Sequence, residues 1–172
     1  MSLLARLFRS APDPRETMRP LWHRTVEISR EPEWYADCGV ADTVAGRFDM
    51  ITAVLSLVLV RMERDEATAR QTALLTELFV EDMDGQLRES GVGDIVVGKH
   101  MGKLMASLGG RLRAFRAALS EENGDTLEDA VMRNITLQEQ AATEALAGRL
   151  RRLWGDLSAL AADELLAGRI AR

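Results

Sequence analysis

Residues 42–62 read DTVAGRFDMITAVLSLVLVRM, and nearly every position from Phe48 onward is apolar. The polar exceptions in that part are Asp49, Thr52, Ser56 and Arg61. A surface helix has an apolar stripe opposite a polar face, whereas a helix that is apolar nearly all round must be buried nearly all round. We therefore predict a central helix at about 47–62 that the other helices wrap. The alternative is a helix with one face open to a hydrophobic partner.

The composition bounds the fold class. Only 11 residues separate Asp49 from Arg61, well short of the roughly 20 that span a bilayer. With 172 residues, 47% hydrophobic and 28% charged, the chain is typical of a single soluble domain. Four prolines and few aromatics favour an all-α bundle of about six to seven helices. Besides the central one, we expect helices at about 20–30, 68–90, 95–119, 126–134, 137–154 and 157–170.

Charge and cysteine content exclude some classes of protein. The net charge of −5 argues against DNA binding, which needs a basic face. The one cysteine, Cys38, excludes an internal disulfide and fits a reducing compartment. The start, MSLLARLFR, lacks the long apolar core of a secretory signal, so we expect none.

Residues 1–19 are predicted to be a basic amphipathic segment, followed by one helical domain over 20–172. Residues 1–30 hold six arginines against three acids. One interpretation is contact with an anionic membrane surface or a partner. The other is a frayed terminus whose apolar residues dock on the body. The residues expected to touch a membrane are Leu4, Arg6, Leu7, Phe8 and Arg9.

Charge is segregated between two expected neighbouring helices. Residues 63–89 carry eight acids and three arginines, whereas residues 95–119 carry five basic residues and no acid. Intramolecular pairing across the bundle is one interpretation. The other interpretation is that the two helix faces contact different partners, since a basic helix suits an acidic protein, a lipid head-group layer or ribosomal RNA.

Three glycines indicate close packing. Gly46, in the first turn of the central helix, suggests either a close neighbour or a helix that begins later in the chain. Gly98 and Gly102, four residues apart, would let another backbone approach their helix.

Catalytic motifs are lacking in the sequence. His23 and His100 have no metal-ligand partner at helical spacing. No nucleophile elbow, CxxC pair or phosphate-binding glycine loop occurs. The carboxylates at 81–84 lack the Glu-x-x-His motif of di-metal bundles. From chemistry alone, the chain reads as a helical interaction module, with no cofactor and no enzymatic activity.

Three blocks go further: DTVAGRFDM at 42–50, EDMDGQLRESGVGDIVVGK at 81–99, and GRLRAF at 110–115. Their order and spacing, over about residues 20–120, resemble the ubiquinol–cytochrome c chaperone family. That resemblance implies an all-helical, non-enzymatic protein that helps assemble respiratory complex III. Its mitochondrial members act on newly made cytochrome b, with a small partner protein and near the ribosomal exit tunnel. It implies a place in the cytoplasm at the inner face of a bacterial inner membrane, or at the mitochondrial inner membrane in a eukaryote.

The resemblance also suggests a site. We expect a partner surface where the blocks meet; the alternative is a structural network that fixes the connectors between helices. The residues concerned are Arg47, Asp82, Arg88, Asp94, Lys99 and Lys103. The family tends to have a histidine near Val54 and a tyrosine at Phe115. Both departures weigh against contact with haem or quinone at those positions.

Two further functions compete with the chaperone. A carrier of an apolar cofactor such as quinone or haem predicts a closed pocket of about 300–1,000 Å³ with convergent polar groups. The chaperone predicts an open apolar groove. A membrane-surface adaptor predicts liposome binding that weakens with salt.

Overall fold

The computed structural model describes residues 13–89, 94–120, 126–139, 141 and 143–171, with the backbone alone at 94–96. Within these residues the chain forms a single all-α domain without strands, as predicted. Six of the described helices have eight residues or more: α2 (Arg19–Ser29), α4 (Val44–Glu63), α6 (Thr72–Glu89), α7 (Asp94–Ser120), α8 (Leu127–Asn134) and α9 (Thr143–Ala159). Shorter turns are η1 (Pro14–Met18), α3 (Glu33–Ala36), α5 (Glu66–Ala69) and α10 (Ala162–Leu166).

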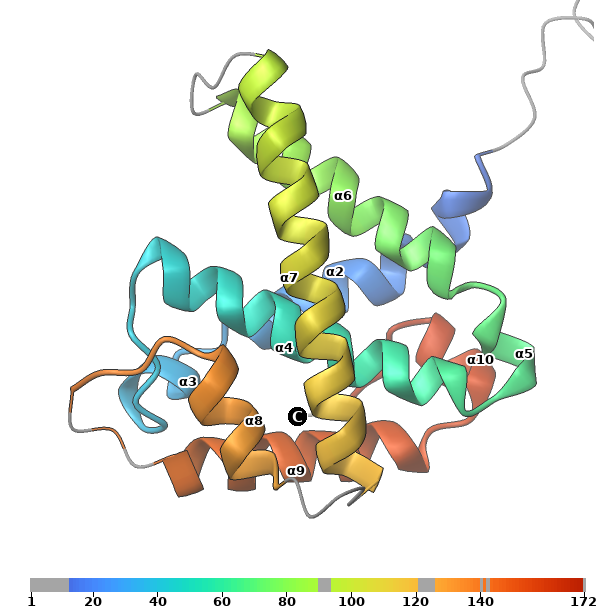
Figure 1. The fold of residues 1–172 in the computed structure, drawn as a ribbon. Coiled ribbons are helices and arrows are strands. Elements are labelled where there is room, and N and C mark those ends of the chain that lie inside the picture. The colour runs from blue at the N-terminus through green and yellow to red at the C-terminus, as the bar shows by residue number, and fades with distance from the viewer. Residues whose placement is uncertain (1–12, 90–93, 121–125, 140, 142, 172) are drawn as a thin grey trace, which may run out of the picture.

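Helix α4 is the centre of the fold. Its cap, Thr43, accepts a hydrogen bond from the backbone N–H of Gly46 at 3.1 Å. Every residue from Asp49 to Val60 is buried. Helices α2, α6, α7 and α9 all pack against α4, and α7 crosses it (Figure 1). The prediction of a wrapped central helix is confirmed for this part of α4.

The predictions made for the glycines have different outcomes. A Cβ at Gly46 would lie 2.0 Å from the carbonyl oxygen of Ala41, so this glycine does have a close backbone neighbour. Among the described residues, no atom lies within 4 Å of a Cβ added at Gly98 or at Gly102. The prediction of a close backbone approach at α7 is therefore wrong.

Tertiary pairing moves some helix boundaries. The backbone N–H of Ala41 donates to Thr136 O at 2.9 Å, and Gln138 N–H donates to Gly39 O at 2.9 Å. Residues 136–138 are therefore extended, and α9 starts at Thr143 rather than at 137. The helix expected at 157–170 is also wrong, because α9 continues to 159 and only the short α10 follows.

The ion pairs of α7 join it to the central helix. Arg116 pairs with Glu63 at 2.7 Å, and Arg111 pairs with Asp49, both acids belonging to α4. In contrast, Glu81 of α6 lies 3.4 Å from Arg15 of η1. The pairing expected between the basic residues 95–119 and the acidic residues 63–89 therefore occurs at Arg116 with Glu63, whereas Arg111 pairs with Asp49, which lies outside that acidic stretch.

The described part of the N-terminal segment packs on the body. Helix η1 contacts α6 and α2, and its Met18 is 1% exposed. Residues 1–12 lie outside the described residues. The division of the chain at residue 19 stays a prediction.

Candidate functional site

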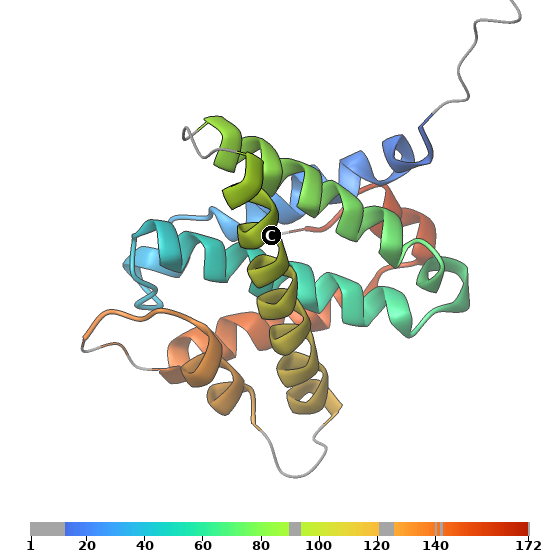
Figure 2. The ribbon, with the colours of Figure 1, turned by 45° about the horizontal axis from the view of Figure 1, so that its top comes forward.

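An apolar groove of about 550 Å³ lies beside the N-terminal half of α4. Helices α6 and α7 extend together past α4, as Figures 1 and 2 both show. The groove is bordered by the first turns of α4, the later part of α6, Leu104 of α7 and the end of α2. Its lining residues are Arg30, Val44, Arg47, Phe48, Ile51, Met83, Gln86, Leu87 and Leu104.

The groove passes from an open rim to a buried floor. Val44, Phe48 and Ile51 follow one another at helical spacing, so one face of α4 contributes all three. Val44 is 89% exposed, whereas Ile51 is 7% and Met83 6% exposed. The apolar surface therefore runs without interruption from the molecular exterior into the core.

A buried polar network fixes the two helices that enclose the groove. Asp49 accepts hydrogen bonds from the Arg111 guanidinium and from the N–H and hydroxyl of Thr136, the last two at 2.8 and 2.6 Å. Arg111 also donates to the Thr52 hydroxyl at 2.8 Å, and its guanidinium lies 5.3 Å from the centre of the Phe48 ring. The network thus sets the crossing of α7 over α4 directly behind a lining residue of the groove.

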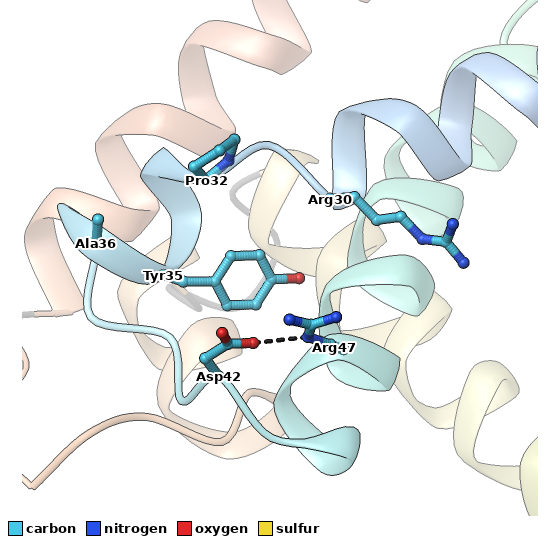
Figure 3. Close-up of a pocket in the computed structure, with 6 residues that line it drawn as sticks. All are labelled: Arg30, Pro32, Tyr35, Ala36, Asp42 and Arg47. Carbon is cyan, nitrogen blue, oxygen red and sulfur yellow. Dashed lines mark hydrogen bonds and ion pairs between the residues drawn. The ribbon is translucent and has the colours of Figure 1, made fainter.

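A second, more polar hollow of about 540 Å³ adjoins the groove (Figure 3). It is lined by Arg30, Pro32, Tyr35, Ala36, Asp42 and Arg47. The two hollows share Arg30 and Arg47, which therefore stand at their junction.

Electrostatics and burial act on this polar hollow. The Arg47 Nε donates to the Asp42 carboxylate at 2.6 Å, and this hydrogen bond holds the pKa of Asp42 below its ordinary value. The same contact raises the pKa of Arg47. The Tyr35 hydroxyl donates to the backbone oxygen of Ser29 at 2.8 Å, and burial raises the pKa of this tyrosine. Tyr35 therefore lines the hollow beside Arg47 in its neutral form.

The structure places one of the expected site residues in the lining of the groove and two others next to lining residues in the chain. Arg47 lines it directly. Arg88 follows the lining residue Leu87 and pairs with Asp84 at 2.6 Å. Lys103 precedes the lining residue Leu104 and is exposed.

Other expected residues lie elsewhere or are not described. Lys99 lies one turn before Lys103 on α7 and is exposed. Asp82 accepts a hydrogen bond from Trp22 Nε1 at 2.6 Å and so joins α6 to α2. The side chain of Asp94 and the membrane-contact residues 4 and 6–9 lie outside the described part of the chain.

Sequence reasoning missed most of the groove. It gave the lining residues of α6 and α7 no part in a groove, and it counted Arg30 only among the six arginines of residues 1–30. Only Val44 carried a signal, because an apolar residue at the first position of a capped helix extends the apolar stripe beyond the buried segment.

Two searches of the described residues had negative results. No three side chains of His, Cys, Asp or Glu gather closely enough there to hold a metal ion. None of the described helices is both long enough and apolar enough to cross a membrane.

Comparison with known proteins agrees with the motif blocks. Residues 36–172 match the family described as ubiquinol-cytochrome C chaperone. No curated protein matches the chain with significance. Among solved structures, the crystal structure of the Cbp3 homolog from Brucella abortus is 29% identical, with a TM-score of 0.77. The match covers 98% of this chain and 96% of that one. The chain belongs to the ubiquinol–cytochrome c chaperone family.

Proposed function

We propose that this chain is an assembly chaperone for respiratory complex III, the ubiquinol–cytochrome c oxidoreductase, and that it holds an apolar segment of newly made cytochrome b in the groove beside α4. Family membership supports the chaperone role and argues for binding rather than catalysis. The observation that carries the site is the open apolar groove, with Val44 89% exposed at its rim.

The energetics of such a groove suit a chaperone. Fully burying one large apolar side chain contributes about 1.5–3 kcal/mol. Two or three client side chains in this groove would therefore contribute roughly 3–9 kcal/mol, from which the entropy cost of association is subtracted. Because that cost is itself several kcal/mol, contacts in the groove alone hold a client only weakly. A chaperone needs that balance, because it must release its client to the assembling complex.

The open rim favours a polypeptide client over a small apolar cofactor. A carrier of quinone or haem needs an enclosed pocket with a few convergent polar groups. The volume of the groove falls within the range for such a pocket. However, its exposed valine and its two arginines suit a segment that enters from outside and leaves again.

The remaining partners are proposals of the same kind. A second small assembly factor and the ribosome are expected from the family. A peripheral position at the inner face of a membrane would place the chaperone where cytochrome b is inserted. The segment proposed for that contact includes residues 4 and 6–9, and liposome flotation of the full chain with and without residues 1–12 tests it.

The experiment uses one substitution at the rim and a matched control. Val44→Glu puts a charge at the groove, and Ala45→Glu puts the same charge on the next residue, which is exposed but does not line the groove. Both acids lie in the first turn of α4, where a negative charge interacts favourably with the helix dipole. Both variants should therefore fold.

A deletion strain of the native host is complemented with each form. Assembled complex III and cytochrome b recovered with the tagged chain are then measured. We expect wild type and Ala45→Glu to restore the complex and to recover cytochrome b, and Val44→Glu to do neither fully. Normal complex III in the deletion strain would refute the function. Equal performance of the two Glu variants would refute the groove as the site.

A further inference from the structure

We infer that Arg30 and Arg47 select the segment that enters the groove, and that the preferred segment carries an acidic side chain next to its apolar face. This inference rests on the proposed function, because it assumes that a polypeptide occupies the groove. It adds the chemical character of that polypeptide: apolar, with a carboxylate at one end of the contact.

The groove differs in charge from the molecule as a whole. The chain has a net charge of −5. Among the described residues that line the groove, however, two are arginines and none is a carboxylate. An acidic protein with a locally positive groove attracts negatively charged partners to that place and disfavours positively charged ones.

The positions of the two arginines also support this inference. Arg30 and Arg47 stand at the junction of the apolar groove and the polar hollow. In Figure 3, Arg30 extends from the end of α2 away from Tyr35, while the Arg47 guanidinium lies beside the Asp42 carboxylate, near the hydroxyl end of Tyr35. Because the two guanidinium groups point in different directions there, an acidic side chain just beyond the apolar part of a bound segment would meet one of them. Arginine presents several N–H donors in a fixed plane that matches a carboxylate.

The guanidinium groups of Arg30 and Arg47 are both available to a partner. No carboxylate among the described residues forms an ion pair with Arg30, which is exposed. Arg47 pairs with Asp42, but the side chains of the two are 63% and 55% exposed. An exposed ion pair of this kind is weak. A carboxylate of the partner can displace Asp42 because it arrives together with apolar groups that are buried in the same step.

A structural role for the arginines makes different predictions. Arg30 ends α2, where a cation interacts favourably with the helix dipole. In that case Arg30→Gln would lower stability without changing which peptides bind. If Arg47 served only to hold Asp42, Asp42→Asn would weaken binding or leave it unchanged. Competition between Asp42 and a partner predicts the opposite sign, namely that Asp42→Asn strengthens binding of an acidic segment.

The test measures peptide binding to the full chain by fluorescence anisotropy. The probe is a fluorescein-labelled amphipathic peptide of about four helical turns, with Leu, Phe and Met on one face and two glutamates at one end. The matched control peptide carries two glutamines in place of the two glutamates. We expect the Glu peptide to bind about fivefold or more tightly at low salt, and the preference to shrink as salt rises.

Three variants assign that preference. Arg30→Gln should reduce the ratio of the two peptide affinities to about twofold or less. It should leave the affinity for the Gln peptide unchanged. Asp42→Asn should tighten the Glu peptide about two- to fivefold and leave the Gln peptide unchanged. Arg70→Gln removes a similarly exposed arginine far from the groove lining and should change neither.

The outcomes separate this inference from the function on which it rests. Equal binding of the two peptides, both lost with Val44→Glu, would overturn the acidic preference and leave the groove as a docking site. Binding of neither peptide would overturn both the inference and the groove, while the deletion strain would still test the chaperone role. Phosphatidylglycerol vesicles bound through Arg30, with no preference between the peptides, would assign the arginines to lipid and also overturn the inference.

Discussion

Removing the Arg111 guanidinium should destabilise the fold more than any other change of one charge on α7. The side chains of Arg111 and Asp49 are 12% and 8% exposed. Removing one partner of a buried ion pair leaves the other charge without compensation and typically costs about 3–5 kcal/mol. In Arg111→Met, Asp49 keeps its hydrogen bonds from Thr136 at 2.8 and 2.6 Å. We therefore expect the lower end, about 3 kcal/mol.

Urea unfolding measures this loss, with circular dichroism and tryptophan fluorescence as two probes. Trp22 and Trp34 are 1% and 0% exposed, so their emission reports the core. For a chain of this length the loss corresponds to a fall in Tm of roughly 6–12 °C. The denaturant slope should be unchanged, since the substitution alters stability and not the surface exposed on unfolding.

Two controls make the test sharp. Arg113→Met removes an exposed arginine two residues along the same helix and should change the free energy of unfolding by less than about 0.5 kcal/mol. The double variant Asp49→Asn with Arg111→Met removes both charges and should lose clearly less than the sum of the single losses, by about 1 kcal/mol or more. A loss below about 1 kcal/mol for Arg111→Met, or strict additivity, would refute the argument.

Two further predictions concern packing and a thiol. Gly46→Ala should lower the free energy of unfolding by more than about 1 kcal/mol, because its Cβ would lie 2.0 Å from a backbone oxygen. Gly98→Ala, with open space at that Cβ, should raise the free energy of unfolding by about 0.5–1 kcal/mol. Urea titration compares the two variants, and a Gly46→Ala variant more stable than wild type would contradict this prediction. Burial raises the pKa of the Cys38 thiol above its ordinary 9.0. The stability that Cys38 contributes should be complete below that pH and decline as pH rises toward the raised pKa. The decline should be absent in Cys38→Ala, and an identical pH profile for the two proteins would contradict the prediction.

The expected partner surface was predictable only in part. Arg47 was chosen from a motif block, and it does line the groove. Asp82 came from the same reasoning, yet it accepts a hydrogen bond from Trp22, 60 residues earlier in the chain. A motif shows which residues a family shares. It does not separate those that face a partner from those that join two helices, because both kinds depend on contacts between distant segments.

The sequence by itself determined the centre of the molecule. A run that is apolar on all sides can be stabilised only by burial, and α4 is buried from Asp49 to Val60. The motif blocks likewise depend on residues close together in the chain, so the family was readable in advance, whereas the helix boundaries near 137 and 157 were not. Whether an apolar face is covered is not a local property. Val44, Phe48 and Ile51 follow the same spacing as the core, and they line a groove only because α6 and α7 pass beside the start of α4. Tertiary structure alone decided that, through the ion pairs and packing that set where α7 crosses the central helix.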